Sequence, residues 1–250
     1  MIRFVMFWMI SLFIGLSPLS ALAADFASID NLDDKRTVEN YQKSIDLCLE
    51  ALAANPNDFG MTWRCARSCR WYSALYKRQG SGDWKEICAK YGKEGMKYAQ
   101  QAIDLEPNKP NGYYWWASSA GEYLDGVSIF TVVKEGLVGK TRESLEKAYA
   151  LDKTYEGAGA IMGLGRFWYV IPWPLKNKKH SLTYLREYQK TEFFGNPHEE
   201  GPIYLAELLV DLGGKDNLAE AKLLLEKAVM TDSIYYKDMA TQILTKIDKP

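Results

Sequence analysis

The chain has 250 residues, of which 47% are apolar and 25% are charged, as in an ordinary globular protein. Its 31 basic and 32 acidic residues leave a net charge of −1. This balance excludes the basic excess of a nucleic-acid-binding surface, and the sequence has no acidic tail.

The beginning of the chain has the pattern of a secretory signal peptide. Arg3 precedes an apolar run at 4–16, which is short for a membrane-spanning helix but typical of a signal. Pro18 ends the run, and Ala21-Leu-Ala23 predicts cleavage before Ala24. We therefore predict a periplasmic or secreted protein; the alternative is an uncleaved anchor. No cysteine follows the cleavage site, so a bacterial lipoprotein is not indicated.

The remaining sequence carries apolar residues at helical spacing, separated by turns rich in glycine and proline. No strand pattern of useful length interrupts these segments. We predict helices at residues 38–54, 60–78, 84–105, 113–123, 141–151, 157–170, 182–190, 203–212, 218–230 and 236–247.

One helix ending recurs, with alanine and leucine on one stripe before a stop near proline or aspartate. The copies lie at residues 44–56, 95–107, 144–153 and 221–232. This ending is typical of a tetratricopeptide-type hairpin, which buries its apolar face only by stacking on further copies. The distance from Pro56 to Pro107 exceeds the usual repeat of about 34 residues. We therefore predict an all-α, irregular tetratricopeptide-like α-solenoid of antiparallel helical hairpins, forming one domain over 24–250 after a signal peptide over 1–23.

Four cysteines in an exported protein favour disulfides. Cys48 and Cys65 lie about two turns on either side of Pro56, and Cys69 and Cys88 flank a glycine-rich turn. Because such positions face each other in an antiparallel helix pair, we predict the bonds Cys48–Cys65 and Cys69–Cys88. The alternative, a metal pair at Cys65 and Cys69, lacks nearby histidines, so we predict no metal.

Two segments depart from the repeat pattern. Residues 124–139 form a strongly apolar insertion, which we predict to be a helical or partly irregular loop folded back on the solenoid. Residues 157–165 hold four glycines, each unfavourable in an isolated helix by about 1 kcal/mol, so we expect close helix packing there. No strand precedes this segment, so it does not predict nucleotide binding.

Several blocks of residues resemble one family in their order and spacing. They are Tyr113-Tyr-Trp-Trp-Ala117, residues 144–155, Gly163-Leu-Gly-Arg-Phe-Trp-Tyr169, Pro172-Trp-Pro-Leu-Lys-Asn177, residues 181–185 and Tyr204-Leu-Ala-Glu-Leu-Leu209. The stretch 99–230, a little over half of the chain, resembles the tetratricopeptide-like T component of TRAP (tripartite ATP-independent periplasmic) transporters and related bacterial proteins. The resemblance implies an all-helical periplasmic homo-oligomer, such as a trimer, that binds a solute-binding protein or shelters a small ligand. Such T components are often lipid-anchored, which this chain is not predicted to be.

The aromatic run Tyr113-Tyr-Trp-Trp116 is the first candidate for a binding site. Four consecutive aromatic residues cover every face of a helix, so they cannot all point into one core. In the functional interpretation Tyr114 and Trp115 line a ligand groove, with Glu122 as a polar contact. The alternative is that Tyr113 and Trp116 pack inside while the other two fill the seam between repeats.

Arg166 is the charge that we select as functional. It lies on a glycine-rich, aromatic helix, where a cation must find a carboxylate or a ring face. Arg166 would clamp an anionic ligand; the alternative is an internal salt bridge to Glu122 or Glu156.

Pro172-Trp-Pro174 begins a rigid loop with a basic rim. We interpret it as a docking loop for an acidic partner protein, with Trp173 as the anchor and Lys176 beside it. The alternatives are a plain turn with solvated charges and a buried Trp173.

No motif predicts catalysis or a cofactor. His180 and His198 lack metal-ligand spacing, and we expect His198-Glu-Glu200 to be a solvated loop. We therefore predict a periplasmic protein-interaction or ligand-binding module, accessory to TRAP-type solute uptake, that is not an enzyme. The alternatives are a structural scaffold of the cell envelope without a ligand, and a hydrolase with two facing carboxylates.

Overall fold

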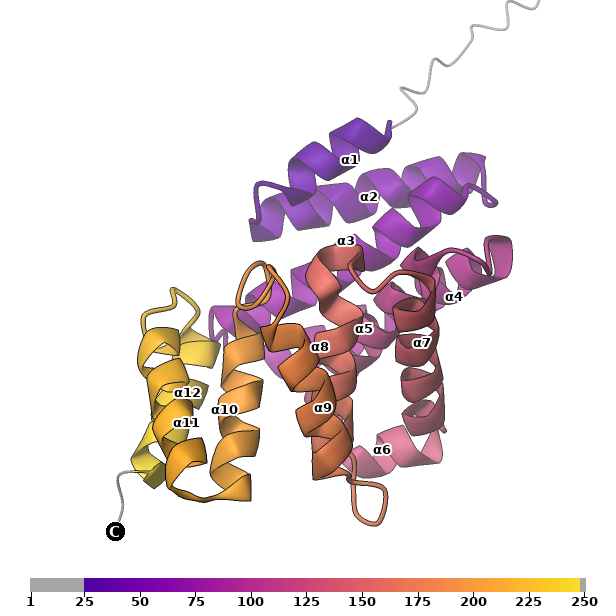
Figure 1. Cartoon of the computed structure of the whole chain (residues 1–250). Coiled ribbons are helices and arrows are strands. Elements are labelled where there is room, and N and C mark those ends of the chain that lie inside the picture. The colour runs from indigo at the N-terminus through magenta and orange to yellow at the C-terminus, as the bar shows by residue number, and fades with distance from the viewer. Residues whose placement is uncertain (1–24, 248–250) are drawn as a thin grey trace, which may run out of the picture.

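The computed structural model describes residues 25–247, so the predicted signal peptide lies outside the described residues. Twelve helices and no strand occur within this range, which confirms the predicted all-helical fold (Figure 1). The helices are α1 (Phe26–Asp33), α2 (Val38–Ala54), α3 (Phe59–Arg78), α4 (Trp84–Leu105), α5 (Pro110–Gly126), α6 (Ile129–Lys134), α7 (Leu137–Leu151), α8 (Tyr155–Val170), α9 (Lys178–Gln189), α10 (Glu200–Leu212), α11 (Lys215–Ala228) and α12 (Ile234–Ile247).

The helices α1 to α5 form the N-terminal half, in which α2, α3, α4 and α5 pack each on the next. The pair α4 and α5 packs especially closely because Gly92 of α4 faces the backbone of α5. A Cβ atom at Gly92 would lie 2.5 Å from the amide nitrogen of Tyr123. Since real Cβ atoms do not approach so closely, the missing side chain is what allows the two backbones to touch.

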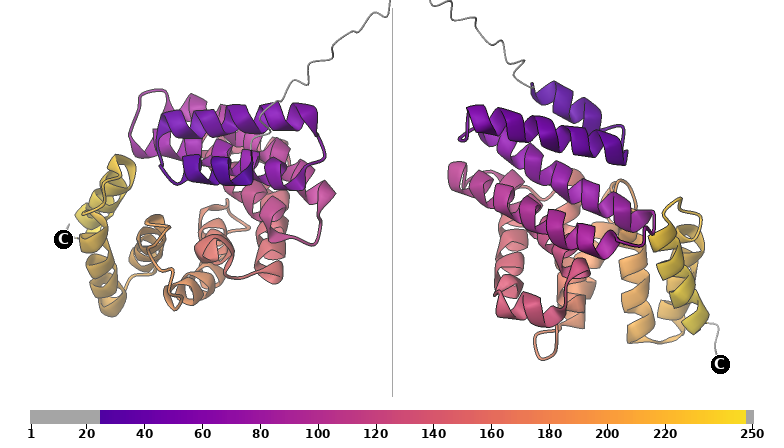
Figure 2. Two further views of the ribbon diagram at one scale, coloured as in Figure 1. Left: turned by 90° about the horizontal axis from the view of Figure 1, so that it is seen from above. Right: turned by 180° about the vertical axis from the view of Figure 1, so that it is seen from behind.

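The helices α7 to α12 form the C-terminal half. They stand side by side in Figure 1, and the view from above in Figure 2 shows that they curve around one side of the molecule. The curve brings α12 into contact with α3, although the two are far apart in sequence. The solenoid therefore encloses a concave inner face, to which α3, α5, α7, α8, α10 and α12 contribute side chains.

The apolar insertion at 124–139 contains the short helix α6, which is capped by Ser128. The predicted helix start at Thr141 is wrong. The helix α7 begins at Leu137 because Gly136, with φ of 69°, turns the chain immediately before it. The hydroxyl of Thr141 donates instead to the carbonyl of Leu137, one turn back along the same helix.

The glycines of α8 allow close packing, as expected for residues 157–165. A Cβ atom at Gly159 would lie 2.4 Å from the hydroxyl oxygen of Tyr114, and one at Gly165 would lie 2.6 Å from Leu185. The space beside the helix is thus filled by side chains from α5 and α9.

The structure corrects the prediction for the cysteines: Cys48, Cys65, Cys69 and Cys88 are buried free thiols, and neither predicted disulfide is present. Hydrogen bonds from Cys48 and Cys69, followed by burial, raise the pKa of the Cys65 thiol. The three thiols of α2 and α3 therefore form one cluster. The Sγ of Cys88 lies apart, 3.7 Å from a carboxylate oxygen of Glu122. The predicted neighbours Cys48 and Cys65 do lie together, but Cys65 also meets Cys69, one turn further along α3, and Cys88 lies against Glu122 instead of Cys69.

Candidate functional site

A cavity of about 210 Å³ opens on the inner face of the solenoid, and we call it the inner groove. One wall is apolar and comes mainly from α5, α7 and α8, with Leu124, Leu145 and Phe167 among its members. The other wall carries charged and tyrosine side chains from α3, α10 and α12. Residues from both halves of the chain thus meet around one space.

Lys77 of α3 is buried in the charged wall, with 4% of its surface exposed. Its Nζ donates to the carboxylates of Glu122 at 2.7 Å and Asp125 at 2.8 Å, both on α5. Burial alone would lower the pKa of Lys77, but the charges of Asp125 and Glu122 more than offset this and hold it well above its usual value. The ammonium group therefore stays charged and ties α3 to α5 across the groove.

Arg70 lies two turns before Lys77 on α3 and is 6% exposed. Its guanidinium stacks 3.9 Å from the ring centre of Trp71. Its Nη2 lies 3.7 Å from Glu122 and 3.8 Å from Glu200, which is too far for hydrogen bonds. Its Nε and Nη1 atoms have no hydrogen-bond partner among the described residues. Arg70 therefore lines the groove as a buried cation with unmatched donors.

Glu200 begins α10 and faces Arg70 and Arg78 of α3. Burial alone would raise the pKa of Glu200, but His198, Arg78 and Arg70 together hold it below its usual value. Burial lowers the pKa of His198, whose Nε2 donates to the carbonyl of Glu156 at 2.7 Å. The expectation that His198-Glu-Glu200 is solvated is wrong, because His198 is 1% and Glu200 2% exposed.

A second cavity of about 160 Å³ lies beside this charge network, between α3, the segment that joins α1 to α2, and the start of α8. Of the three non-glycine residues with positive φ in the described range, Arg36 and Glu156 line this cavity. Burial raises the pKa of both Asp33 and Glu156. Asp33 accepts hydrogen bonds from Arg67 and Ser68, however, so it is a structural ion-pair partner and not a free acid.

Three of the six predicted site residues come together in the inner groove: Tyr114, Glu122 and Arg166. Tyr114 is 3% exposed, and burial raises its pKa, so it presents a neutral hydroxyl. Arg166 pairs with Glu207 of α10 and lies 4.3 Å from the ring centre of Tyr204. Arg166 therefore forms an internal salt bridge, as the alternative interpretation holds, but its partner is Glu207 of α10 and not Glu122 or Glu156.

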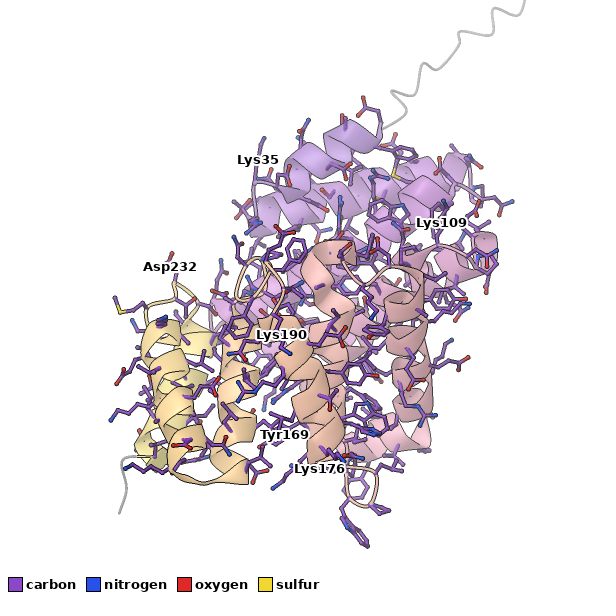
Figure 3. All side chains as sticks on the ribbon, in the orientation of Figure 1. Lys35, Lys109, Tyr169, Lys176, Lys190 and Asp232 are labelled. Atoms are coloured by element: carbon purple, nitrogen blue, oxygen red, sulfur yellow. The ribbon has the colours of Figure 1, made fainter. Side chains whose placement is uncertain are left out.

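The other three predicted site residues lie outside the groove. Trp115 is fully buried, and its Nε1 donates to the hydroxyl of Tyr155 at 3.0 Å. Trp173 is 87% exposed in the loop between α8 and α9, so it is not a core residue. Lys176 of the same loop lies 4.0 Å from the ring centre of Tyr169, at the lower end of the molecule in Figure 3.

Arg70, Lys77 and Glu200 were missed from the sequence. A usable signal existed for α3, because Arg70 and Lys77 are seven positions apart and share a helix face with the small residues Ser73 and Ala74. A cation on a face that is otherwise small and buried indicates an internal ion pair. In the part of the chain that the structure describes, no cluster of histidine, cysteine or acidic residues could hold a metal ion.

The stacked hairpins and the groove that they enclose define a tetratricopeptide-like helical-repeat protein. The thermophilic TPR protein TTC0263 of Thermus thermophilus has a similar fold, with a TM-score of 0.61 and 16% sequence identity over 89% of this chain and 100% of that chain. At this identity the likeness shows the fold alone. The de novo designed helical repeat protein DHR64 aligns over 89% of either chain with 13% identity and a TM-score of 0.21.

The family follows from the sequence. A family model described as Regulator of microtubule dynamics protein 1-3 matches residues 25–172, which is more than half of the chain. The chain belongs to this family. No curated protein matches it.

Proposed function

We propose that this chain is a non-catalytic binding module whose inner groove holds a segment of a partner protein. Tetratricopeptide-like repeats generally mediate protein interactions, and they present the concave face of the stacked helices to their partners. The inner groove lies on that face and combines an apolar wall with a charged one. A bound segment would contact both halves of the solenoid at once.

The unmatched donors of Arg70 carry this proposal. Arginine has five N–H donors, and each buried donor without an acceptor costs about 1–3 kcal/mol. Nε and Nη1 of Arg70 have no partner among the described residues, while Nη2 is beyond hydrogen-bond distance from its two carboxylates. These donors are buried, but Arg70 lines the inner groove, so a small shift of its guanidinium would let carbonyl or carboxylate oxygens of a bound segment supply the missing acceptors.

A structural scaffold without a ligand is the alternative. A scaffold has no use for a buried guanidinium, since well-packed apolar residues of similar volume are often as stable or more so. It would also gain nothing from leaving Leu124 and Leu145 beside an open cavity, because unfilled apolar space forgoes packing energy. Both walls of the groove therefore support a binding role.

Filling the groove tests the proposal. Gly121 of α5 lines the groove, and a Cβ atom there meets nothing within 4 Å, so Gly121→Trp projects into the groove without displacing the core. Gly139 of α7 is equally open and is not part of the groove lining, so Gly139→Trp is the matched control. We expect wild type and Gly139→Trp, each tagged and isolated from the native source, to retain a partner that Gly121→Trp loses. Equal retention by both variants would contradict the proposal.

We further propose that the protein works in the periplasm as an accessory to TRAP-type uptake, with a solute-binding protein as its partner. The signal-peptide pattern at 4–23 and the resemblance of residues 99–230 support this finer proposal. Mass spectrometry of the retained protein tests it, and light scattering tests for a trimer. A partner of another class would overturn the transport role and leave the groove proposal standing.

The family description names microtubule dynamics, which is a property of the proteins for which the family is named. An exported chain would not meet microtubules, so we expect no co-sedimentation with polymerised tubulin. Co-sedimentation that Gly121→Trp abolishes and Gly139→Trp retains would replace the periplasmic proposal with a cytoskeletal one.

A further inference from the structure

Exposed apolar side chains gather at one end of the molecule. Of the eleven large apolar side chains that are exposed in the described residues, five come from two short segments, 130–133 and 170–175. We call these five the apolar edge: Phe130, Val133, Val170, Trp173 and Leu175. Its two aromatic members are the most exposed of all, Trp173 at 87% and Phe130 at 83%.

The two segments meet at the same end because α7 and α8 are antiparallel neighbours. The helix α6 leads into the start of α7, and the loop with Trp173 leaves the end of α8. Val138 near the start of α7 and Ile171 after α8 belong to the same core cluster, which brings the two segments together. Both segments lie at the lower end in Figure 1 and in the rear view of Figure 2.

The loop after α8 is a built turn that holds Trp173 outward. The amide of Leu175 donates to the carbonyl of Pro172 at 3.0 Å, and the amide of Asn177 donates to the carbonyl of Trp168 at 2.9 Å. Prolines on both sides of Trp173 fix their own φ angles. The indole of Trp173 is therefore exposed because an ordered, hydrogen-bonded turn holds it there.

Basic residues outnumber acidic ones around the apolar edge. Residues 171–180 contain Lys176, Lys178 and Lys179 and no acidic residue, whereas Lys134 directly follows Val133 and is itself followed by the exposed Glu135. Asp211 at the end of α10 pairs with Lys178 and lies 3.9 Å from Lys176. Lys134 and Lys179 are exposed. Apolar tips with a lysine rim match the charge and the chemistry of an anionic bilayer surface.

We propose that the apolar edge docks the protein peripherally on an anionic lipid bilayer, with Trp173 and Phe130 seated at the headgroup level. Tryptophan is enriched at membrane interfaces because its ring is apolar and its N–H is polar. No helix within residues 25–247 is long and apolar enough to cross a membrane. An acidic protein surface is the alternative occupant, and the vesicle experiment distinguishes the two. This inference is independent of the groove proposal.

Vesicle co-sedimentation tests the proposal. The wild-type protein should pellet with vesicles of equal parts phosphatidylcholine and phosphatidylglycerol, and much less with pure phosphatidylcholine vesicles. The double variant Phe130→Ala/Trp173→Ala should bind the anionic vesicles at least tenfold more weakly. The double variant Leu223→Ala/Met230→Ala is the matched control, because both side chains are apolar and exposed in and just after α11, outside the apolar edge. Lys134→Ala and Lys179→Ala should each weaken binding about fivefold.

Equal binding by the two double variants, or no binding of the wild type to anionic vesicles, would overturn the proposal. Loss of a captured acidic protein in Phe130→Ala/Trp173→Ala, without any vesicle binding by the wild type, would assign the edge to a protein partner instead. Gly121→Trp should keep full vesicle binding, so a failure of the groove proposal leaves this result interpretable.

Discussion

The inner groove and the apolar edge depart from the usual distribution of side chains in opposite directions. The groove buries charged groups such as Arg70 and Lys77, whereas the edge exposes aromatic groups such as Trp173. Buried charges are stable only while their partners remain, so groove residues are bound up with folding itself. Exposed aromatic groups make few contacts, so edge residues are free to serve association. Substitutions of the buried charges of the groove should therefore change stability, and substitutions at the edge should change binding alone.

Two tryptophans give the largest contrast. Trp115 is fully buried beside the groove, and Trp115→Ala should lower the free energy of unfolding by about 4 kcal/mol through the lost contacts and the cavity left behind. Trp173→Ala should change it by less than about 0.5 kcal/mol, with no loss of helicity. Urea unfolding followed by circular dichroism measures both. If Trp173→Ala lowered the free energy of unfolding nearly as much as Trp115→Ala, Trp173 would be a core residue and the contrast between groove and edge would fail.

Lys77 tests whether the buried charges of the groove support the fold. Lys77→Met leaves the buried Glu122 without its hydrogen-bonded cation, and we expect a loss of about 3 kcal/mol. The control Lys97→Met removes an exposed ion pair with Glu94 and should cost less than about 1 kcal/mol. Chemical denaturation measures the free energy of unfolding of the two variants. No loss of stability in Lys77→Met would show that the packing of α3 on α5 does not depend on this ion pair.

The smallest expected effect is a pH dependence from His198. Burial lowers the pKa of His198 in the folded protein, whereas an unfolded histidine titrates near about 6.5. Below that pH the unfolded chain binds a proton that the folded chain does not, so the free energy of unfolding falls as pH drops. His198→Gln should reduce this slope, and His180→Gln, at an exposed site, should keep it.

Urea unfolding of the two variants between about pH 7 and pH 5.5 tests this slope, because that range contains the pKa of an unfolded histidine. Asp33 and Glu156 have raised pKa values, so their protonation increases the free energy of unfolding as pH drops, opposite to the effect of His198. Their contribution is the same in both variants, so the difference between the two slopes isolates His198. Identical slopes in the two variants would show that burial of His198 has no titration consequence.

The helices were predictable because they depend on local patterns. Apolar spacing located α2, α3 and α4, and Asp58 caps α3 by accepting a hydrogen bond from the amide of Met61. Asn177 caps α9 in the same way, so that helix begins at Lys178 and not at the predicted residue 182. The start of α7 was not predictable from the sequence, because the left-handed Gly136 lets the helix begin four residues before Thr141, which has the chemistry of a cap.

The groove was harder to predict because its contacts join distant segments. Lys77 meets its carboxylates on α5, and Arg70 meets Glu200 on α10 only after the solenoid has curved. No local pattern distinguishes such a buried charge from a solvated one, which is why His198-Glu-Glu200 was assigned to solvent. Tyr114, Glu122 and Arg166 were found because they stand out on aromatic or glycine-rich helices.

Native mass spectrometry of the protein isolated unreduced from its native source tests the central claim most directly. A groove that holds a partner segment predicts an added mass on wild type and on Gly139→Trp that is absent from Gly121→Trp. Bare protein in all three samples, or the same added mass on all three, would contradict the account and favour a scaffold.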